Sequence, residues 1–260
     1  MDRITIEQAT RAPLETVWSA CSELQGLRSW QADEVAGAVA PGALLELGWP
    51  ALGVGIELRV ELVEPGRRLV FQSDDSRLEL ELSPGRVQLS HEAAFDDEDE
   101  REGTRSSWKM ALATLAHFVE EHAGHTREVH WSIERAPVSV ETAHTFFTGA
   151  AAQTAWLTRT GRGTGVGEPG SEVALDLAWG SALTGRVLAH TEPRDALVSW
   201  RETNRSLLAF RTLPCPDGVA ERLLAVTWSH WNLPDSARHA EQLDGALGRL
   251  RRVLSNRATA

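Results

Sequence analysis

The sequence predicts an α+β protein of two tandem domains, each a curved antiparallel sheet wrapped around a long C-terminal helix. Three observations lead to this fold class. The segment at residues 12–18 returns in outline at residues 136–144, and a strand-like alternating run precedes it both times. Several more alternating runs follow each copy. Each set then ends in one long helical stripe, which is the mark of a repeated structural unit.

The first copy begins with alternating apolar and polar residues at 4–11, the pattern of a half-buried strand. A proline then suits the first position of a helix, and residues 13–21 carry an apolar stripe at helical spacing. Alternating runs bounded by Pro-Gly turns predict antiparallel strands over residues 45–95. The acidic run at 96–102 is expected to be a solvated loop, and residues 104–122 the closing helix.

The second copy repeats this order. A strand is predicted at 129–135, a helix after Pro137, and further strands up to residue 231. Residues 236–254 form the closing helical stripe. Trp30 and Trp156, which lie 126 residues apart, end the helical region of each copy.

The predicted domains are residues 1–124 and 126–260, with the junction near a short Ala-Gly-His-Thr stretch. One antiparallel sheet followed by a single amphipathic helix must bury that helix on one sheet face. Sheets are rarely flat, so the sheet should curve around the helix and leave space against it. A cavity in that position is the default place to look for a ligand.

Composition limits the partners and the compartment. A net charge of −11 and a pI near 5.3 argue against a nucleic-acid or anionic-membrane surface as the main partner. No stretch approaches the ~20 apolar residues of a membrane span, and no basic region followed by an apolar one predicts a signal peptide. Two cysteines cannot form a disulfide framework, which favours a cytoplasmic protein.

The sequence predicts neither a metal site nor a cofactor. His117 and His122 are five residues apart, which separates them by about 140° around a helix and prevents a shared-face zinc pair. The glycine-rich segment 161–167 follows a predicted helix and lacks the Gly-Lys-Ser/Thr of a phosphate-binding loop. It is expected to be a flexible connection that could act as a lid over the cavity mouth, with anion binding as the alternative.

The aromatic residues are the main indication of a ligand site. The chain has ten Trp, six Phe and no Tyr, and each Trp supplies a large apolar surface with a single donor. Those of the second copy fall on or beside strands of the expected concave face, which favours a flat aromatic or polycyclic ligand there. Core packing is the alternative explanation. The predicted wall comprises Trp156, Trp179, Val198, Trp200, Phe210 and Trp228 in the second domain, with Trp30 and Trp49 in the first.

Three polar residues are candidates to face the cavities. By strand alternation, His91 and His230 each share a face with apolar neighbours. Each could donate to a ligand or act as an acid or base, or be a hydrogen-bonded core histidine. Glu202 shares the face of Trp200 by the same rule, or else sits at an exposed strand end. No sequence pattern places a nucleophile beside a histidine and an acid, so catalysis is not favoured.

Several landmarks occur in both copies: Ala12–Trp18, Trp30 and Pro41–Gly42 in the first, and Ala136–Pro137, Val140–Thr142, Trp156 and Pro169–Gly170 in the second. With the closing helices, this pattern resembles the START/Bet v 1-like (SRPBCC) helix-grip superfamily. Within it, the chain is most similar to the AHSA1-like (activator of Hsp90 ATPase homologue) and polyketide cyclase groups. The second copy departs from the pattern at His144, where the first has Trp18, and in its glycine-rich insert.

The resemblance covers nearly the whole chain and implies an apolar cavity in which members bind lipids, sterols or polyketides. Three functions stay open. The first is non-catalytic binding of a hydrophobic small molecule, with the working pocket in residues 126–260. The second is an AHSA1-type module that contacts a chaperone. The third is a polyketide cyclase- or hydrolase-like enzyme that uses His230 and Glu202. The chain is expected to be a monomeric pseudo-dimer or a homodimer.

Overall fold

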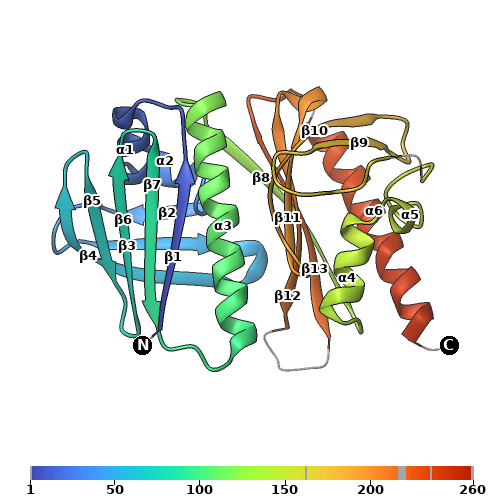
Figure 1. Cartoon of the computed structure of the whole chain (residues 1–260), viewed down its shortest axis with the longest axis horizontal. Helices are drawn as coiled ribbons and strands as arrows, with labels where there is room; N and C mark the ends of the chain where they lie inside the picture. Colours follow the sequence, from blue (N-terminus) through green and yellow to red (C-terminus); the bar gives the residue numbers. More distant parts are fainter. Residues whose placement is uncertain (1, 162, 216–220, 235, 259–260) are drawn as a thin grey trace. The chain divides into compact units, whose positions relative to one another are not determined.

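The computed structural model describes residues 2–161, 163–215, 221–234 and 236–258. The chain divides into two compact units, residues 1–127 and 128–260 (Figure 1). Each unit has one antiparallel sheet followed by a long helix, so the predicted α+β fold with a tandem helix-grip arrangement is confirmed. No helix in the described ranges combines the length and the apolar character that crossing a membrane requires.

The first unit has a seven-stranded sheet in the order β1-β7-β6-β5-β4-β3-β2, with all pairs antiparallel. The N-terminal strand therefore pairs with the last strand rather than with its neighbour in sequence. In chain order the elements are β1 (Asp2–Ala9), α1 (Leu14–Ser22), α2 (Leu24–Arg28), β2 (Glu34–Gly37), β3 (Leu44–Trp49), η1 (Pro50–Leu52), β4 (Val54–Glu64), β5 (Arg68–Gln72), β6 (Ser76–Ser83), β7 (Arg86–Ala93) and α3 (Glu98–Glu121).

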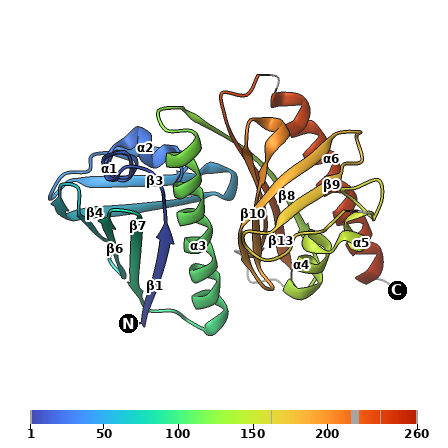
Figure 2. The same ribbon diagram turned by 45° about the horizontal axis from the view of Figure 1, so that its top comes forward.

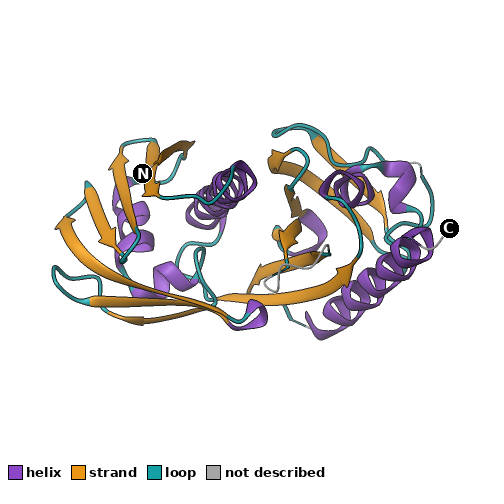
Figure 3. Cartoon of the chain, turned by 90° about the horizontal axis from the view of Figure 1, so that it is seen from below, coloured by secondary structure: helices purple, strands orange, loops and turns teal. Residues whose placement is uncertain are grey.

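The strand register separates the two faces of this sheet. Ile4 pairs with His91, His91 with Leu78, and Leu78 with Phe71, so these four side chains share one face. That face, called the inner face below, carries the core. The sheet curves around α3, as seen end-on in Figure 3. The helix packs beside β1 and buries an apolar stripe that includes Leu112, Leu115 and Val119.

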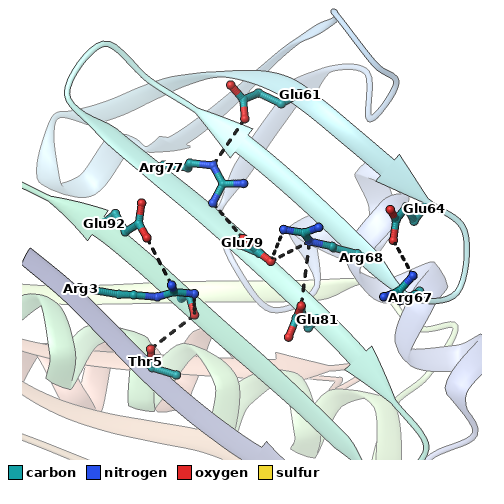
Figure 4. Close-up of polar contacts among 11 residues, drawn as sticks. Arg3, Thr5, Glu61, Glu64, Arg67, Arg68, Arg77, Glu79, Glu81 and Glu92 are labelled. Atoms are coloured by element: carbon teal, nitrogen blue, oxygen red, sulfur yellow. Dashed lines mark hydrogen bonds and ion pairs between the residues drawn. The ribbon is translucent and has the colours of Figure 1, made fainter. Parts of the chain in front are cut away.

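The opposite face of the first sheet is covered with ion pairs (Figure 4). Glu79 is almost buried between Arg68 and Arg77, with N–O distances of 2.6 and 2.9 Å. Burial alone would raise the pKa of Glu79, but the hydrogen bonds from the two arginines outweigh it and lower the pKa below its usual value. Arg3 and Glu92 add a pair on the neighbouring strands. This face is therefore polar, which leaves the inner face for apolar contacts.

The long helix of the first unit begins earlier than the sequence predicted. Residues 96–102 were expected to be a solvated loop, but α3 starts at Glu98. Asp97 caps it by accepting a hydrogen bond from the backbone N–H of Glu100 at 2.8 Å. Acidic side chains in the first turn also face the positive end of the helix dipole. The run that looked like a loop by charge is thus a well-suited helix start.

The second unit has a six-stranded sheet in the order β8-β13-β12-β11-β10-β9. Its long helix buries Ala246 together with the stripe that the sequence predicted, Leu243, Leu247, Leu250 and Leu254. In chain order the elements are β8 (Arg127–Ala136), α4 (Val140–Thr148), α5 (Ala150–Gln153), β9 (Glu172–Asp176), β10 (Ala182–Thr191), β11 (Asp195–Trp200), η2 (Arg201–Thr203), β12 (Ser206–Pro214), β13 (Arg222–Trp231) and α6 (Ser236–Ala258).

A hydrogen bond recurs at the same place in both units. The indole nitrogen of Trp30 donates to the main-chain oxygen of Ala20 at 3.0 Å. The indole nitrogen of Trp156 donates to the main-chain oxygen of Phe146 at 2.9 Å. Donor and acceptor are both displaced by 126 residues between the two units. The repeat read from the sequence is therefore a repeat of structure.

Candidate ligand-binding surfaces

The predicted aromatic wall of the second domain forms a packed core. Trp156, Trp200, Trp228 and Phe210 are each at most 1% exposed. Their rings contact one another or Phe147 with centroids 5.7–6.2 Å apart. The walls of a cavity large enough for water keep some accessible surface, so these rings are in contact on all sides. A ligand that contacts these four rings would have to displace side chains that now pack against them.

Hydrogen bonds fix the indoles of this core. The indole nitrogen of Trp228 donates to the hydroxyl of Ser206 at 2.8 Å, and that of Trp200 to the main-chain oxygen of Ala182 at 3.1 Å. Buried indoles usually find such partners. Val198 is fully buried in the same cluster, and half-buried Trp179 packs against it. These residues act together as structural members of the core.

His230 points inward, as the strand alternation predicted. Its side chain is almost fully buried, and its ring centroid lies 4.6 Å from that of Trp228. Nε2 lies 3.9 Å from a carboxylate oxygen of Glu128, too far for a hydrogen bond. Burial lowers the pKa of His230 most, and Glu128 opposes this shift. The side chain is therefore a neutral imidazole held in an aromatic environment at neutral pH.

Of the two positions expected for Glu202, inward or exposed at a strand end, the structure has the exposed one. Strand β11 ends at Trp200, and Glu202 lies in the following η2 turn with an exposed side chain. Its carboxylate accepts hydrogen bonds from the backbone N–H and the hydroxyl of Thr184, at 2.9 and 2.5 Å. The alternation of inward and outward side chains does not extend to Glu202, because β11 ends before it. Buried His230 and exposed Glu202 therefore do not face the same interior.

A serine, a histidine and an aspartate do meet elsewhere on the second domain. Nε2 of His130 lies 2.9 Å from a carboxylate oxygen of Asp244, and the hydroxyl of Ser132 donates to the same oxygen. In a catalytic triad the acid contacts one ring nitrogen and the nucleophile the other. Here the hydroxyl and the carboxylate both face Nε2. The cluster joins β8 to α6 and lacks the geometry of a hydrolase.

The inner face of the first domain holds a different arrangement. The indole nitrogen of Trp108, on α3, donates to Nδ1 of His91 on β7 at 3.0 Å. The ring of Phe95 meets His91 edge-on. Burial lowers the pKa of His91, against a smaller opposing effect of Asp75. Because Nδ1 accepts from the indole, the neutral ring carries its proton on Nε2 and can donate from there.

The β3–β4 hairpin extends this inner face as an exposed apolar surface. Val54 pairs with Trp49 across the hairpin, and Ile56 pairs with Leu47, which is buried. Cross-strand partners share a face, so these side chains continue the core surface. Val54 is nevertheless 45% exposed, Ile56 is 42% exposed, and Trp49 is half-buried. We call Trp49, Val54 and Ile56, with half-buried Val35 on β2, the hairpin surface.

Two glycines of the glycine-rich segment lie close to backbone of other elements. Arg162 of this segment lies outside the described residues. A Cβ on Gly163 would lie 2.6 Å from the main-chain oxygen of Ala174, and one on Gly165 would lie 2.7 Å from that of Thr148. Gly165 also has a φ of +69°. Glycine is required here because the chain passes close to α4 and β9.

Sequence reasoning missed one contact, between His144 on α4 and His190 on β10 (both elements are labelled in Figure 2). His144 was noted only as a departure from Trp18, and no spacing signalled its partner. Metal binding has no support in the described ranges, where no three His, Cys, Asp or Glu side chains are grouped as ligands. Buried Trp30 belongs to the core of the first domain.

The chain is similar to a known protein family and to several solved structures. Residues 11–120 match the family described as "Activator of Hsp90 ATPase homolog 1-like protein". DynU16, from the dynemicin biosynthetic locus, is 17% identical with a TM-score of 0.44, covering 98% of this chain and 99% of its own. The di-domain ARO/CYC BexL, from the BE-7585A biosynthetic pathway, is 15% identical with a TM-score of 0.42, covering 100% and 94%.

The Aha1 dimer from Colwellia psychrerythraea is 18% identical with a TM-score of 0.43, covering 48% of this chain and 100% of its own. No curated protein matches the sequence. The family match lies within the first domain.

Proposed function

We propose that this chain, in which residues 11–120 form an AHSA1-like domain, binds a hydrophobic small molecule without transforming it, and that the hairpin surface of the first domain is the contact. The ligand class is a lipid, a polyketide or an aromatic compound. The observation that carries this proposal is the exposure of Val54 and Ile56 on the face that elsewhere forms the core. Large exposed aliphatic side chains on the sheet face that carries the core are typical of a surface that contacts a ligand or a partner.

The energetics of covering this surface are favourable. Complete burial of an Ile or Val side chain contributes roughly 1.5–3 kcal/mol, so covering the exposed parts of Val54 and Ile56 contributes about 1 kcal/mol each. Trp49 adds an aromatic face beside them. The second domain offers no comparable surface among its predicted wall residues, because its rings are packed against one another.

The polar groups of the inner face suit binding rather than catalysis. His91 lies on the same face three strands from β4, so it could donate from Nε2 to a ligand that extends across the sheet from the hairpin surface. Its other nitrogen is bonded to Trp108 instead of a carboxylate that would orient it as a base.

Tryptophan fluorescence tests the proposal. The full chain would be titrated with a panel of fatty acids, sterols and aromatic polyketides, with Trp49 as the reporter nearest the surface. Ile56→Ser should weaken binding about fivefold to tenfold, because it removes about 1 kcal/mol of contact. Leu44→Ser is the matched control: Leu44 is 41% exposed but lies on the opposite face, opposite Arg59, so it should bind as the parent does. Equal affinities of both variants for every ligand would contradict the proposal.

The family match favours one alternative, contact of the same surface with a chaperone of the Hsp90 class. This alternative predicts that the chain changes the ATPase rate of Hsp90 and that Ile56→Ser removes the effect while Leu44→Ser keeps it. An unchanged ATPase rate at saturating chain would reject it.

A further inference from the structure

Two histidines of the second domain meet head to head beside the glycine-rich segment. Nε2 of His144 lies 2.8 Å from Nε2 of His190, and the rings are nearly parallel with centroids 5.0 Å apart. Nδ1 of His190 lies 2.9 Å from the main-chain oxygen of Gly167. This chain of contacts joins α4, β10 and the glycine-rich segment, whose described residues, 161 and 163–167, we call the glycine strap.

A β-bulge turns His190 toward this contact. The register of β10 against β11 shifts between Val187 and Ala189, so His190 pairs with Ala196. Ala196 is buried in the core, and its partner on β12 is Phe210, whose ring belongs to the same core. Without the extra residue, Ala189 would take this place and His190 would point to the other face.

The strap covers part of the interior of the second domain. Val166 is buried in the core cluster with Trp156 and Phe147. Its backbone N–H donates to the main-chain oxygen of Thr148 at the end of α4. Thr164 is bonded to Ala174 of β9 through both its backbone and its hydroxyl. The histidine pair holds the other end of this strap, at Gly167.

Donor and acceptor rules fix the protons of the pair. A carbonyl only accepts, so Nδ1 of His190 carries a hydrogen bonded to Gly167. In the neutral pair, Nε2 of His190 is then the acceptor and Nε2–H of His144 the donor. One added proton can be accommodated. When His190 carries a hydrogen on both ring nitrogens and His144 carries its hydrogen on Nδ1, Nε2–H of His190 donates to Nε2 of His144. With two added protons, both Nε2 atoms carry hydrogens and face each other, and the contact must break.

We propose that His144 and His190 form a proton-operated clasp that holds the glycine strap on the second domain and releases it when both imidazoles are protonated. Burial lowers the pKa of His144 most, and the neighbouring His190 lowers it further. Glu192 and Asp195 act in the opposite direction. His144 is therefore neutral at neutral pH, where the pair holds at most one added proton and the clasp is closed.

The other charged groups around the clasp moderate the effect. Asp195, on β11, lies 3.6 Å from Arg211 on β12, which offsets part of its attraction for a charged histidine. Glu168 directly follows the last residue of the strap, Gly167, and is exposed, so water screens its charge. The carboxylates favour addition of the first proton to the pair. After a second proton is added, the two N–H groups that face each other have no shared acceptor.

Hydrogen exchange of the full chain tests the clasp. Mass spectrometry would compare peptides of the strap with peptides of α6 at about pH 7.5 and about pH 5, corrected for intrinsic exchange rates. In the parent, strap protection should fall about tenfold or more on acidification while α6 stays protected. His144→Gln keeps a donor at the same position and cannot take a charge, so its strap should stay protected at both pH values. His190→Phe removes both contacts and should expose the strap at both.

His239→Gln is the matched control, because it removes another histidine of the same domain that lies outside the clasp. Its strap should respond to acid as the parent does. Equal strap protection in the parent at both pH values would overturn the proposal. So would loss of protection in His144→Gln to the same extent as in the parent, or simultaneous loss in α6, which would mean global unfolding. The His144→Gln comparison stands even if His190→Phe does not fold.

Discussion

Trp30 and Trp156 make the same hydrogen bond in their two domains, each indole donating to the main-chain oxygen ten residues before it. Both rings are almost fully buried. The bond closes the turn after the first helices and brings the chain back to the sheet. Because the same hydrogen bond occurs in both domains, the same substitution can be tested in each of them.

Replacing either tryptophan by phenylalanine should destabilise its domain. Trp156→Phe removes the indole donor to the main-chain oxygen of Phe146, at a cost of about 1–3 kcal/mol, and Trp30→Phe removes the one to Ala20. Urea denaturation followed by far-ultraviolet circular dichroism measures the loss. Trp179→Phe is the control, because the indole nitrogen of Trp179 is buried without a partner among the described residues. Equal losses of stability in the three variants would contradict a stabilising role for the two indole hydrogen bonds.

Stability should fall as the pH drops from about 7 to about 5. Burial lowers the pKa of four histidines below the ordinary value of 6.5. Above that value they are neutral in both folded and unfolded chains and contribute nothing. Below it the unfolded chain binds protons first, so folding loses free energy until the pH passes the folded pKa values. Melting temperatures across this range check the sign, and a rise on acidification would contradict it. The four are His91, His144, His230 and His239.

Neutralising one carboxylate on the polar face of the first sheet, that of Glu79, should lower the stability of the protein. Glu79→Gln deprives Arg68 and Arg77 of a charged partner, at a cost of about 1–2 kcal/mol. The lowered pKa of Glu79 means that its contribution is present at neutral pH and disappears as the pH falls through that folded value. Glu81→Gln should cost little, since Glu81 is about half exposed and 4.0 Å from Arg68. Thermal melting at pH 7 distinguishes the two.

The glycine strap should tolerate alanine at one glycine and not at another. Gly165→Ala forces a side chain into a left-handed backbone conformation and against the main chain of Thr148, which should cost about 2 kcal/mol or more. At Gly161 an added Cβ meets nothing nearer than 3.5 Å, so Gly161→Ala should be close to neutral. Denaturant midpoints of the two variants test this, and matching midpoints would mean that the strap adapts freely.

Local patterns in the sequence were sufficient for the fold. Alternation predicted the strands, the leucine spacing predicted the buried stripe of α6, and the 126-residue offset predicted the repeat that the two tryptophans now confirm. These signals are reliable because they reflect periods of a regular backbone against a single core. The pattern failed at the ends of elements: Glu202 lies past the end of its strand, and residues 98–102 belong to the start of a helix.

The tertiary structure alone decided what the side chains do. Aromatic content indicated large apolar surfaces, but only packing distinguishes the filled core around Trp228 from the exposed hairpin surface at Ile56. His144 and His190 are 46 residues apart and come together through a one-residue bulge in β10, which no local spacing encodes. Burial and long-range contacts are properties of the whole folded chain, whereas periodicity is a property of each segment. The sequence therefore determined the scaffold, and the folded structure determined its sites.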